Sequence, residues 1–173
     1  MVTALATNPI EVYAAMKLYD FSPVTRTLLR DVGFSSEKAV SMQDAFSQWF
    51  SLTGSVESGE ILVMLKGDID EVYHAAVLNT AWYGPFCQQF AGAFVHHTPI
   101  DEQTMEELDA GLRYTIDRLD AVYGHTLHPA LREWRQLVEA NNYQISCVKC
   151  PDPQDAAITD TLGHLPNGAR LVH

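Results

Sequence analysis

The sequence DEQTMEELDAGLRYTIDRLDAVY, residues 101–123, decides the fold. Its apolar side chains recur at alternating steps of three and four residues, which places them on one face of an α-helix. Gly124 follows directly and favours the end of a helix at this point. Because a continuous apolar stripe must pack against other elements, the stretch predicts a long helix within a helical protein. The stripe consists of Met105, Leu108, Leu112, Thr115, Leu119 and Val122.

The rest of the chain carries further helix signals. Asn8-Pro9 and Ser22-Pro23 are typical helix starts, because Asn and Ser cap the first turn and proline fits its first position. Gly84-Pro85 predicts a break or kink between two helical pieces, which would form a central helical hairpin. We therefore predict an all-α fold, a single compact domain of about six helices. Helical spacing of apolar residues marks three other stretches, 36–50, 68–80 and 129–140.

Two stretches lack helical periodicity. Residues 61–65, ILVML, are as compatible with a strand as with a buried extended segment, because no partner strand is evident. The periodicity also ends after Asn141, so we expect one domain over residues 1–150 and an irregular tail over residues 151–173. The expected core consists of Phe46, Trp49, Phe50, Val72, Phe86, Phe90, Phe94, Leu108, Leu112, Leu119 and Trp134.

Composition and charge narrow the class of protein. The chain has 173 residues, 47% of them hydrophobic, which is enough for one folded core and argues against intrinsic disorder. It has 22 acidic and 11 basic residues, a net charge of −11, and the scattered basic residues disfavour nucleic-acid binding. No apolar run reaches the ~20 residues of a membrane span, and residues 1–5 lack the features of a signal peptide. We therefore expect a cytoplasmic protein that binds no membrane.

The three cysteines, Cys87, Cys147 and Cys150, do not form the pattern of a secreted disulfide framework. Cys147 and Cys150 form a CxxC pair, whose alternatives are half of a zinc site, a redox pair, or no function at all. We expect Cys87, which lies among phenylalanines, to be poorly accessible. The two cysteines of the CxxC pair are expected to be more accessible, because aperiodic sequence follows them.

A group of histidines and one cysteine lies within residues 68–99. His74 falls on the first arm of the predicted hairpin, Cys87 on the second, and His96 and His97 where the second arm ends. Imidazole and thiolate are ligands that zinc prefers, so the hairpin could bring four ligands around one zinc ion. The alternative is structural, with histidines that bond to the backbone or end a helix and a cysteine that fills the core. Adjacent histidines point in different directions, which opposes joint binding of one ion by His96 and His97.

The same stretch carries a longer motif, made of Asp70, His74, Leu78, Thr80, Tyr83, Phe86, Cys87, Gly92, Phe94, His96, His97 and Pro99. This motif resembles that of the glycine-rich-domain-like proteins, a group of bacterial and plant sequences, and a weaker likeness extends to Trp134. Tyr73 stands where the family has tryptophan, and no glycine-rich region follows. The resemblance implies one set of residues with a shared structural or metal-binding role, and it implies no reaction. This set is His74, Cys87, His96 and His97.

Three functions are compatible with these features, and we favour the first. It is a small acidic binding or adaptor protein of the cytosol, with a His/Cys structural or zinc-binding cluster and a protein partner. The second is a metalloenzyme with an open His/Cys site, in which Asp70 or Glu71 acts as a base. Asp70 lies four residues before His74 on the same helix face, so it could instead orient the imidazole. The third is an acidic inhibitor or immunity-type protein, encoded by a mobile element, that blocks a basic surface.

Overall fold

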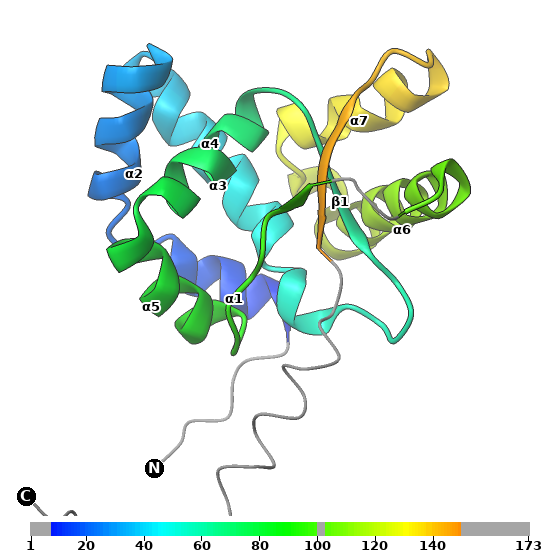
Figure 1. Cartoon of the computed structure of the whole chain (residues 1–173), viewed down its shortest axis with the longest axis horizontal. Coiled ribbons are helices and arrows are strands. Elements are labelled where there is room, and N and C mark those ends of the chain that lie inside the picture. Colours follow the sequence, from blue (N-terminus) through cyan, green and yellow to red (C-terminus); the bar gives the residue numbers. More distant parts are fainter. Residues whose placement is uncertain (1–7, 100–102, 150–173) are drawn as a thin grey trace, which may run out of the picture.

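Helices form most of the structure, which confirms the predicted all-α class (Figure 1). The computed structural model describes residues 8–99 and 103–149. Shorter helical turns within these residues lie at Leu28–Val32, Thr53–Ser55 and Gly124–Thr126. The α-helices of the described part are α1 (Pro9–Met16), α2 (Ser22–Thr27), α3 (Ser36–Phe50), α4 (Asp68–Leu78), α5 (Thr80–Phe90), α6 (Met105–Tyr123) and α7 (Pro129–Glu139).

Helices α1, α3, α6 and α7 begin at residues whose side chains cap the first turn. Ser22 does not cap α2 as its position predicts, because it is the first residue of that helix and its backbone N–H donates to Asp20. The side chain of Asn8 accepts a hydrogen bond from the backbone N–H of Ile10, which satisfies one of the free donors at the start of α1. Helix α6 begins at Met105 rather than at residue 101, because Thr104 and Glu107 form a capping box. In this box each side chain accepts from the backbone N–H of the other residue. Local chemistry therefore sets the first turn of both helices.

The break in the predicted helical hairpin lies earlier than expected. Asn79 separates α4 from α5, and its side-chain amide donates to the hydroxyl of Thr27, 2.9 Å away on α2. Pro85 lies inside α5 and does not interrupt it, so the prediction of a break at Gly84-Pro85 is wrong. Proline removes the donor that the carbonyl of Ala81 would use in a regular helix. Both residues are exposed, so water can satisfy this carbonyl.

A small antiparallel sheet has the strand order β1-β3-β2. The apolar run in residues 61–65 thus contributes a strand, and it pairs with a strand after Asn141 that the sequence pattern did not identify. The outer edge of the first strand is covered, because the backbone of Val63 accepts from the indole N–H of Trp49 and donates to the hydroxyl of Thr115. Such bonds protect the edge from pairing with another chain. The strands are β1 (Leu62–Leu65), β2 (Thr98–Pro99) and β3 (Ile145–Lys149).

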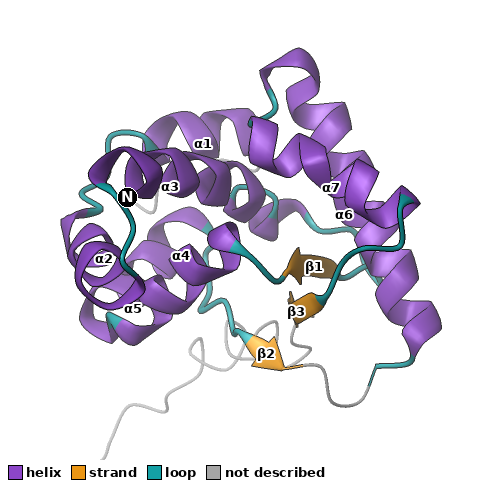
Figure 2. Cartoon of the chain, turned by 90° about the horizontal axis from the view of Figure 1, so that it is seen from above, coloured by secondary structure: helices purple, strands orange, loops and turns teal. Residues whose placement is uncertain are grey.

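The sheet lies between two groups of helices (Figure 2). Helices α1 to α5 gather on one side of the molecule, and α6 and α7 lie on the other. Helix α4 follows β1 in the chain, packs against α3 and α5, and also contacts β1. This arrangement brings the first turn of α4 beside β3, where the hydroxyl of Ser146 donates to the carboxylate of Asp70.

The core is centred on aromatic side chains of α3, α4 and α5. Phe86 is fully buried and contacts Phe46 and Phe50 of α3, with ring centroids 6.3 Å and 4.8 Å apart. All but one of the predicted core residues are buried; the exception is Phe94, which is 44% exposed. Helix α5 ends before it, and Gly92 takes a φ of +78°. The spacing of four residues therefore no longer keeps Phe94 on the apolar face.

Some predictions concern residues outside the described part. The boundary at residue 150, the tail 151–173 and Cys150 all lie there. Among the described residues, no helix combines the length and the apolar character needed to cross a membrane.

His128 caps α7 and links it to α3. Its Nδ1 accepts from the backbone N–H of Ala130 at 3.2 Å, so the neutral ring carries its proton on Nε2. The Nε2–H group then donates to Ser41 Oγ at 3.1 Å. Burial lowers the pKa of His128, and the charge of Asp44 acts in the opposite direction. Because protonation at Nδ1 would remove the cap, the capped helix favours the neutral ring.

We expect the pKa of His128 to make stability depend on pH. A pKa lower in the folded than in the unfolded chain gives a contribution that is present above about pH 6.5 and lost as the pH falls further. From pH 7 to pH 5, the unfolding free energy of the wild type should drop by a few tenths of a kcal/mol more than that of His128→Asn, since asparagine caps without titrating and solvent screens the partly buried ring. Urea unfolding at both pH values measures this difference. Equal pH dependence of the two proteins would contradict it.

Candidate metal centre

Asp70 lies in the first turn of α4, and His74 lies one turn later. They are four residues apart, so a helix places both side chains on one face. The distance from Asp70 Oδ2 to His74 Nδ1 is 3.6 Å. Asp70 lies in the first turn, where the partial positive charge of the helix N-terminus favours a carboxylate. The helix therefore supplies one buried anion and one imidazole to the same point.

His97 reaches this point from the chain between α5 and β2. Two tyrosine hydroxyls hold that chain, because Tyr83 donates to the carbonyl of Val95 at 2.5 Å and Tyr73 donates to the carbonyl of His96 at 3.3 Å. The ring of His97 lies 4.6 Å from the ring of Tyr73, measured between centroids. Burial raises the pKa of both tyrosines well above the usual range, so both keep their protons and act as donors.

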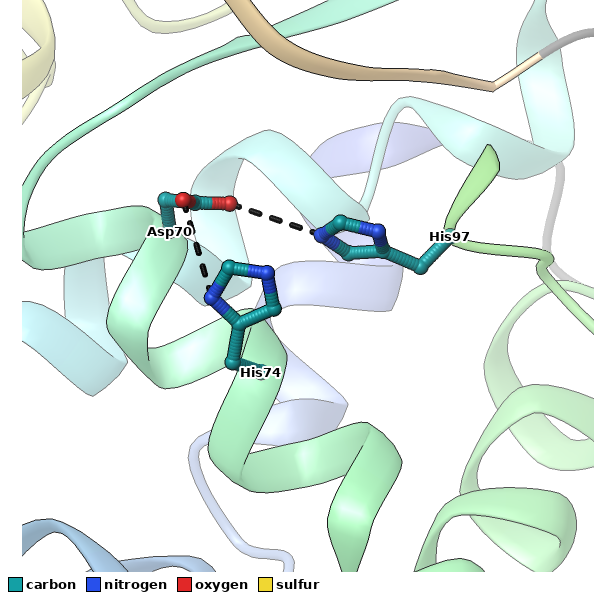
Figure 3. A group of neighbouring side chains, drawn as sticks. All are labelled: Asp70, His74 and His97. Carbon is teal, nitrogen blue, oxygen red and sulfur yellow. Dashed lines mark ion pairs between the residues drawn. The ribbon is translucent and has the colours of Figure 1, made fainter. Parts of the chain in front are cut away.

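The three side chains Asp70, His74 and His97 meet around one point, with the carboxylate next to both rings (Figure 3). Asp70 Oδ1 lies 3.5 Å from His97 Nε2. One ligand atom from each residue lies within 4.8 Å of the others, and the two ring centroids are 4.6 Å apart. We call this group the Asp/His/His triad.

Two atoms of the triad are buried without a hydrogen-bond partner among the described residues, Asp70 Oδ1 and His97 Nε2. The side chain of Asp70 is only 3% exposed and that of His97 is 14% exposed. A buried polar atom without a partner costs about 1–3 kcal/mol, and more when it is charged. At 3.5 Å the two atoms are farther apart than the 2.7–3.2 Å of an ordinary N–H···O bond. A cation shared by both atoms would satisfy them together.

The geometry fits a transition-metal ion. Ligands at about 2.0–2.2 Å from a tetrahedral zinc ion lie about 3.3–3.6 Å from one another. His97 Nε2 lies 3.5 Å from Asp70 Oδ1, and His74 Nδ1 lies 3.6 Å from the other carboxylate oxygen, Oδ2. With one ligand atom from each residue, the three atoms lie within 4.8 Å of one another, so small side-chain movements would bring them to this spacing. Two imidazoles and a carboxylate are a donor set accepted by zinc and by iron(II). The described residues therefore contain a possible His/Asp metal site.

The structure brings together two of the four predicted ligands, His74 and His97, and adds Asp70. Cys87 lies outside this group; its side chain is fully buried on α5 and hydrogen-bonds with the hydroxyl of Tyr83. His96 also lies outside the group, and its exposed ring packs against Phe94 with the centroids 4.9 Å apart.

The prediction for the CxxC pair can be followed only at Cys147. This residue is 1% exposed, so the expectation that it is accessible is wrong. Cys147 lies on β3, which pairs with β1 on one side and β2 on the other. The sequence pattern did not identify this pairing. Burial raises the pKa of the Cys147 thiol well above the usual range, and the nearby charge of Asp70 adds to this effect. Cys147 belongs to no metal-binding group among the described residues, and Cys150 lies outside them.

Sequence reasoning placed Asp70 near His74 but gave it the role of a base or of an orienting partner, not that of a metal ligand. The helical spacing was the available signal, since it already put the carboxylate and the imidazole on one face. No local signal identifies Ser146, because it meets Asp70 only through the sheet.

Comparisons of this chain with family models, curated proteins and solved structures found no match. The resemblance to the glycine-rich-domain-like family stays a prediction, carried by the motif residues alone.

Proposed function

We propose that the protein is a mononuclear metalloprotein whose open centre, the Asp/His/His triad, binds a small oxygen-containing ligand. The observation that carries the proposal is the pair of buried, unpartnered atoms, Asp70 Oδ1 and His97 Nε2, that face each other at 3.5 Å. Without a cation, both atoms are buried with no hydrogen-bond partner among the described residues, which costs free energy. With a divalent cation, both become ligands.

The number of protein ligands supports an open centre over a closed structural one. Structural zinc sites have four protein ligands, and catalytic sites have three with one position left for water or substrate. The triad supplies three among the described residues. The side chain of His74 is 46% exposed, so solvent reaches this side of the group. We therefore favour the metalloenzyme hypothesis over the adaptor hypothesis, with Asp70 as a ligand and not as a base.

Each residue has a definite task in this proposal. Asp70 supplies the negative charge that offsets the cation, His97 holds the buried side, and His74 holds the exposed side. A divalent ion at this place acts as a Lewis acid that polarises a bound carbonyl or lowers the pKa of a bound water.

The test is metal binding by protein purified without an affinity tag. We expect about one equivalent of zinc or iron per chain by elemental analysis. Cobalt(II), exchanged for the native ion, should show visible absorption of a site with nitrogen and oxygen ligands and should shift when azide is added. A cobalt spectrum that does not respond to azide would favour a closed site and the adaptor hypothesis. Protein that binds neither ion would contradict the proposal.

The neighbouring histidines provide a matched pair of variants. His97→Ala removes a ligand of the triad, so we expect the cobalt affinity to fall by at least about 100-fold. His96→Ala makes the same chemical change one residue away on an exposed ring, so the affinity should change by less than about twofold. Titration followed by visible absorption measures both. Equal losses in the two variants would place the metal elsewhere.

The predicted thiolate ligand can be tested in the same spectra. Cys87→Ala should leave the cobalt spectrum unchanged if only the triad binds the ion. A thiolate-to-cobalt charge-transfer band that disappears in Cys87→Ala would restore Cys87 as a ligand.

A further inference from the structure

The carboxylate of Asp70 is held from outside its own helix. Ser146 Oγ, on β3, donates a hydrogen bond of 2.8 Å to Asp70 Oδ2. The other oxygen, Oδ1, has no hydrogen-bond partner among the described residues and faces His97. The serine thus holds the oxygen on the side of His74 and leaves Oδ1 facing His97.

An irregularity in the sheet places this serine. Met64 of β1 pairs with Cys147, but the next residue, Leu65, pairs with Ile145. Ser146 is therefore an additional residue in β3, which is the arrangement of a β-bulge. Bulges change the direction of a side chain and are frequent beside functional sites. The bulge accounts for how Ser146, next to the buried Cys147, reaches α4.

We propose that Ser146 is a positioning residue of the metal site and that it makes metal affinity depend on the pairing of β3 with β1. This inference rests on the proposed metal site. Partners that hydrogen-bond to metal ligands fix the orientation of those ligands, and their loss lowers metal affinity about 10–100-fold. Because Ser146 belongs to β3, Asp70 is oriented for a cation only while β3 is paired.

Thermodynamic linkage adds a second consequence. If pairing of β3 raises the affinity for the ion, then the bound ion must stabilise the pairing of β3 by the same factor. His97 directly precedes β2, so the ion would also connect that strand to α4. The metal site then controls how firmly the middle and outer strands of the sheet are held.

The experiment compares cobalt binding by the wild type and three serine variants. Ser146→Ala should lower the affinity by about 10–100-fold and alter the visible cobalt spectrum. Ser146→Thr keeps the hydroxyl and favours a strand, so it should restore both the affinity and the spectrum. Ser58→Ala, at an exposed serine in the loop before β1, is the matched control and should bind as the wild type does.

The outcomes separate the two proposals. If the wild type binds no ion, the proposed function and this inference both fail. If the wild type binds cobalt and Ser146→Ala binds it with the same affinity and spectrum, only the positioning role is overturned. An alanine variant that threonine does not rescue would also overturn it, because the loss would then not depend on the hydroxyl.

Hydrogen exchange decides the question if Ser146→Ala does not fold. In the wild type, saturating zinc should slow exchange of the β3 amides by at least about tenfold relative to the metal-free protein, and should leave the amides of α7 little changed. Zinc that binds without slowing exchange in β3 would contradict the coupling.

Discussion

The substitution Asp70→Asn is expected to stabilise the metal-free protein and to abolish its stabilisation by zinc. The carboxylate of Asp70 is buried, and its Oδ1 lacks a hydrogen-bond partner among the described residues. An asparagine could keep the bond from Ser146 through its oxygen and donate its amide N–H to His97 Nε2. We expect the free energy of unfolding to rise by about 1–2 kcal/mol without metal, because both unpartnered atoms are then satisfied.

With zinc bound, the wild type should be more stable than Asp70→Asn, which is the opposite of the order expected without metal. A ligand present at about 1,000 times its dissociation constant stabilises the native state by about 4 kcal/mol. The wild type should gain this amount, and Asp70→Asn should gain little, because a neutral amide is a poor ligand for zinc. Thermal unfolding of the wild type and of Asp70→Asn, each with chelator and with zinc, measures these four stabilities.

The matched control is Asp68→Asn, two residues earlier in the same helical turn. The Asp68 carboxylate is half exposed and pairs with Lys38 at 2.8 Å. Its loss should lower stability by less than about 1 kcal/mol with or without metal and should leave the zinc effect intact. If the triad instead exists as an ion pair between Asp70 and a protonated His97, Asp70→Asn would destabilise the metal-free protein. That result, together with no effect of zinc on the wild type, would remove the basis of the metal site.

The part of the fold that the sequence predicts is the part set by local chemistry. Helix α6 follows from its apolar stripe, and Asn8 accepts the capping bond that its position indicates. The sheet cannot be predicted from local sequence in this way, because β1 and β3 are separated by about 80 residues in the chain. Pairing at that distance depends on the helices between them, and a five-residue strand carries too little pattern to identify its partner.

The same limit applies to the candidate site. Helical spacing alone relates Asp70 to His74, and the sequence reasoning used it. The choice between His96 and His97 depends on how Tyr73 and Tyr83 hold the chain after α5, which is a tertiary property. Cys87 has the ligand chemistry that zinc prefers, but its side chain is buried on α5 outside the triad. Residue type alone therefore suggested more metal ligands than the folded chain brings together at the triad.

Phe86→Ala is expected to cost about 3–5 kcal/mol of unfolding free energy, the largest loss of stability that we predict from one side chain. Phe86 is fully buried, and the tertiary packing around it explains this cost. Its ring lies 4.5 Å from that of Trp82 and 4.8 Å from that of Phe50, measured between centroids. Removing the ring leaves a cavity that rigid aromatic neighbours cannot fill, and the lost contacts add to the lost burial.

Phe94→Ala is the matched control for Phe86→Ala, since the chemical change is the same and only burial differs. Phe94 is 44% exposed and packs on Tyr83 with the ring centroids 5.2 Å apart. We expect its loss to cost about 1 kcal/mol, because roughly half of the ring is already in water. Urea unfolding of both variants measures the difference, which should be at least about 2 kcal/mol. If both variants lost the same stability, Phe94 would belong to the core as its spacing predicts, and the end of α5 at Phe90 would be wrong.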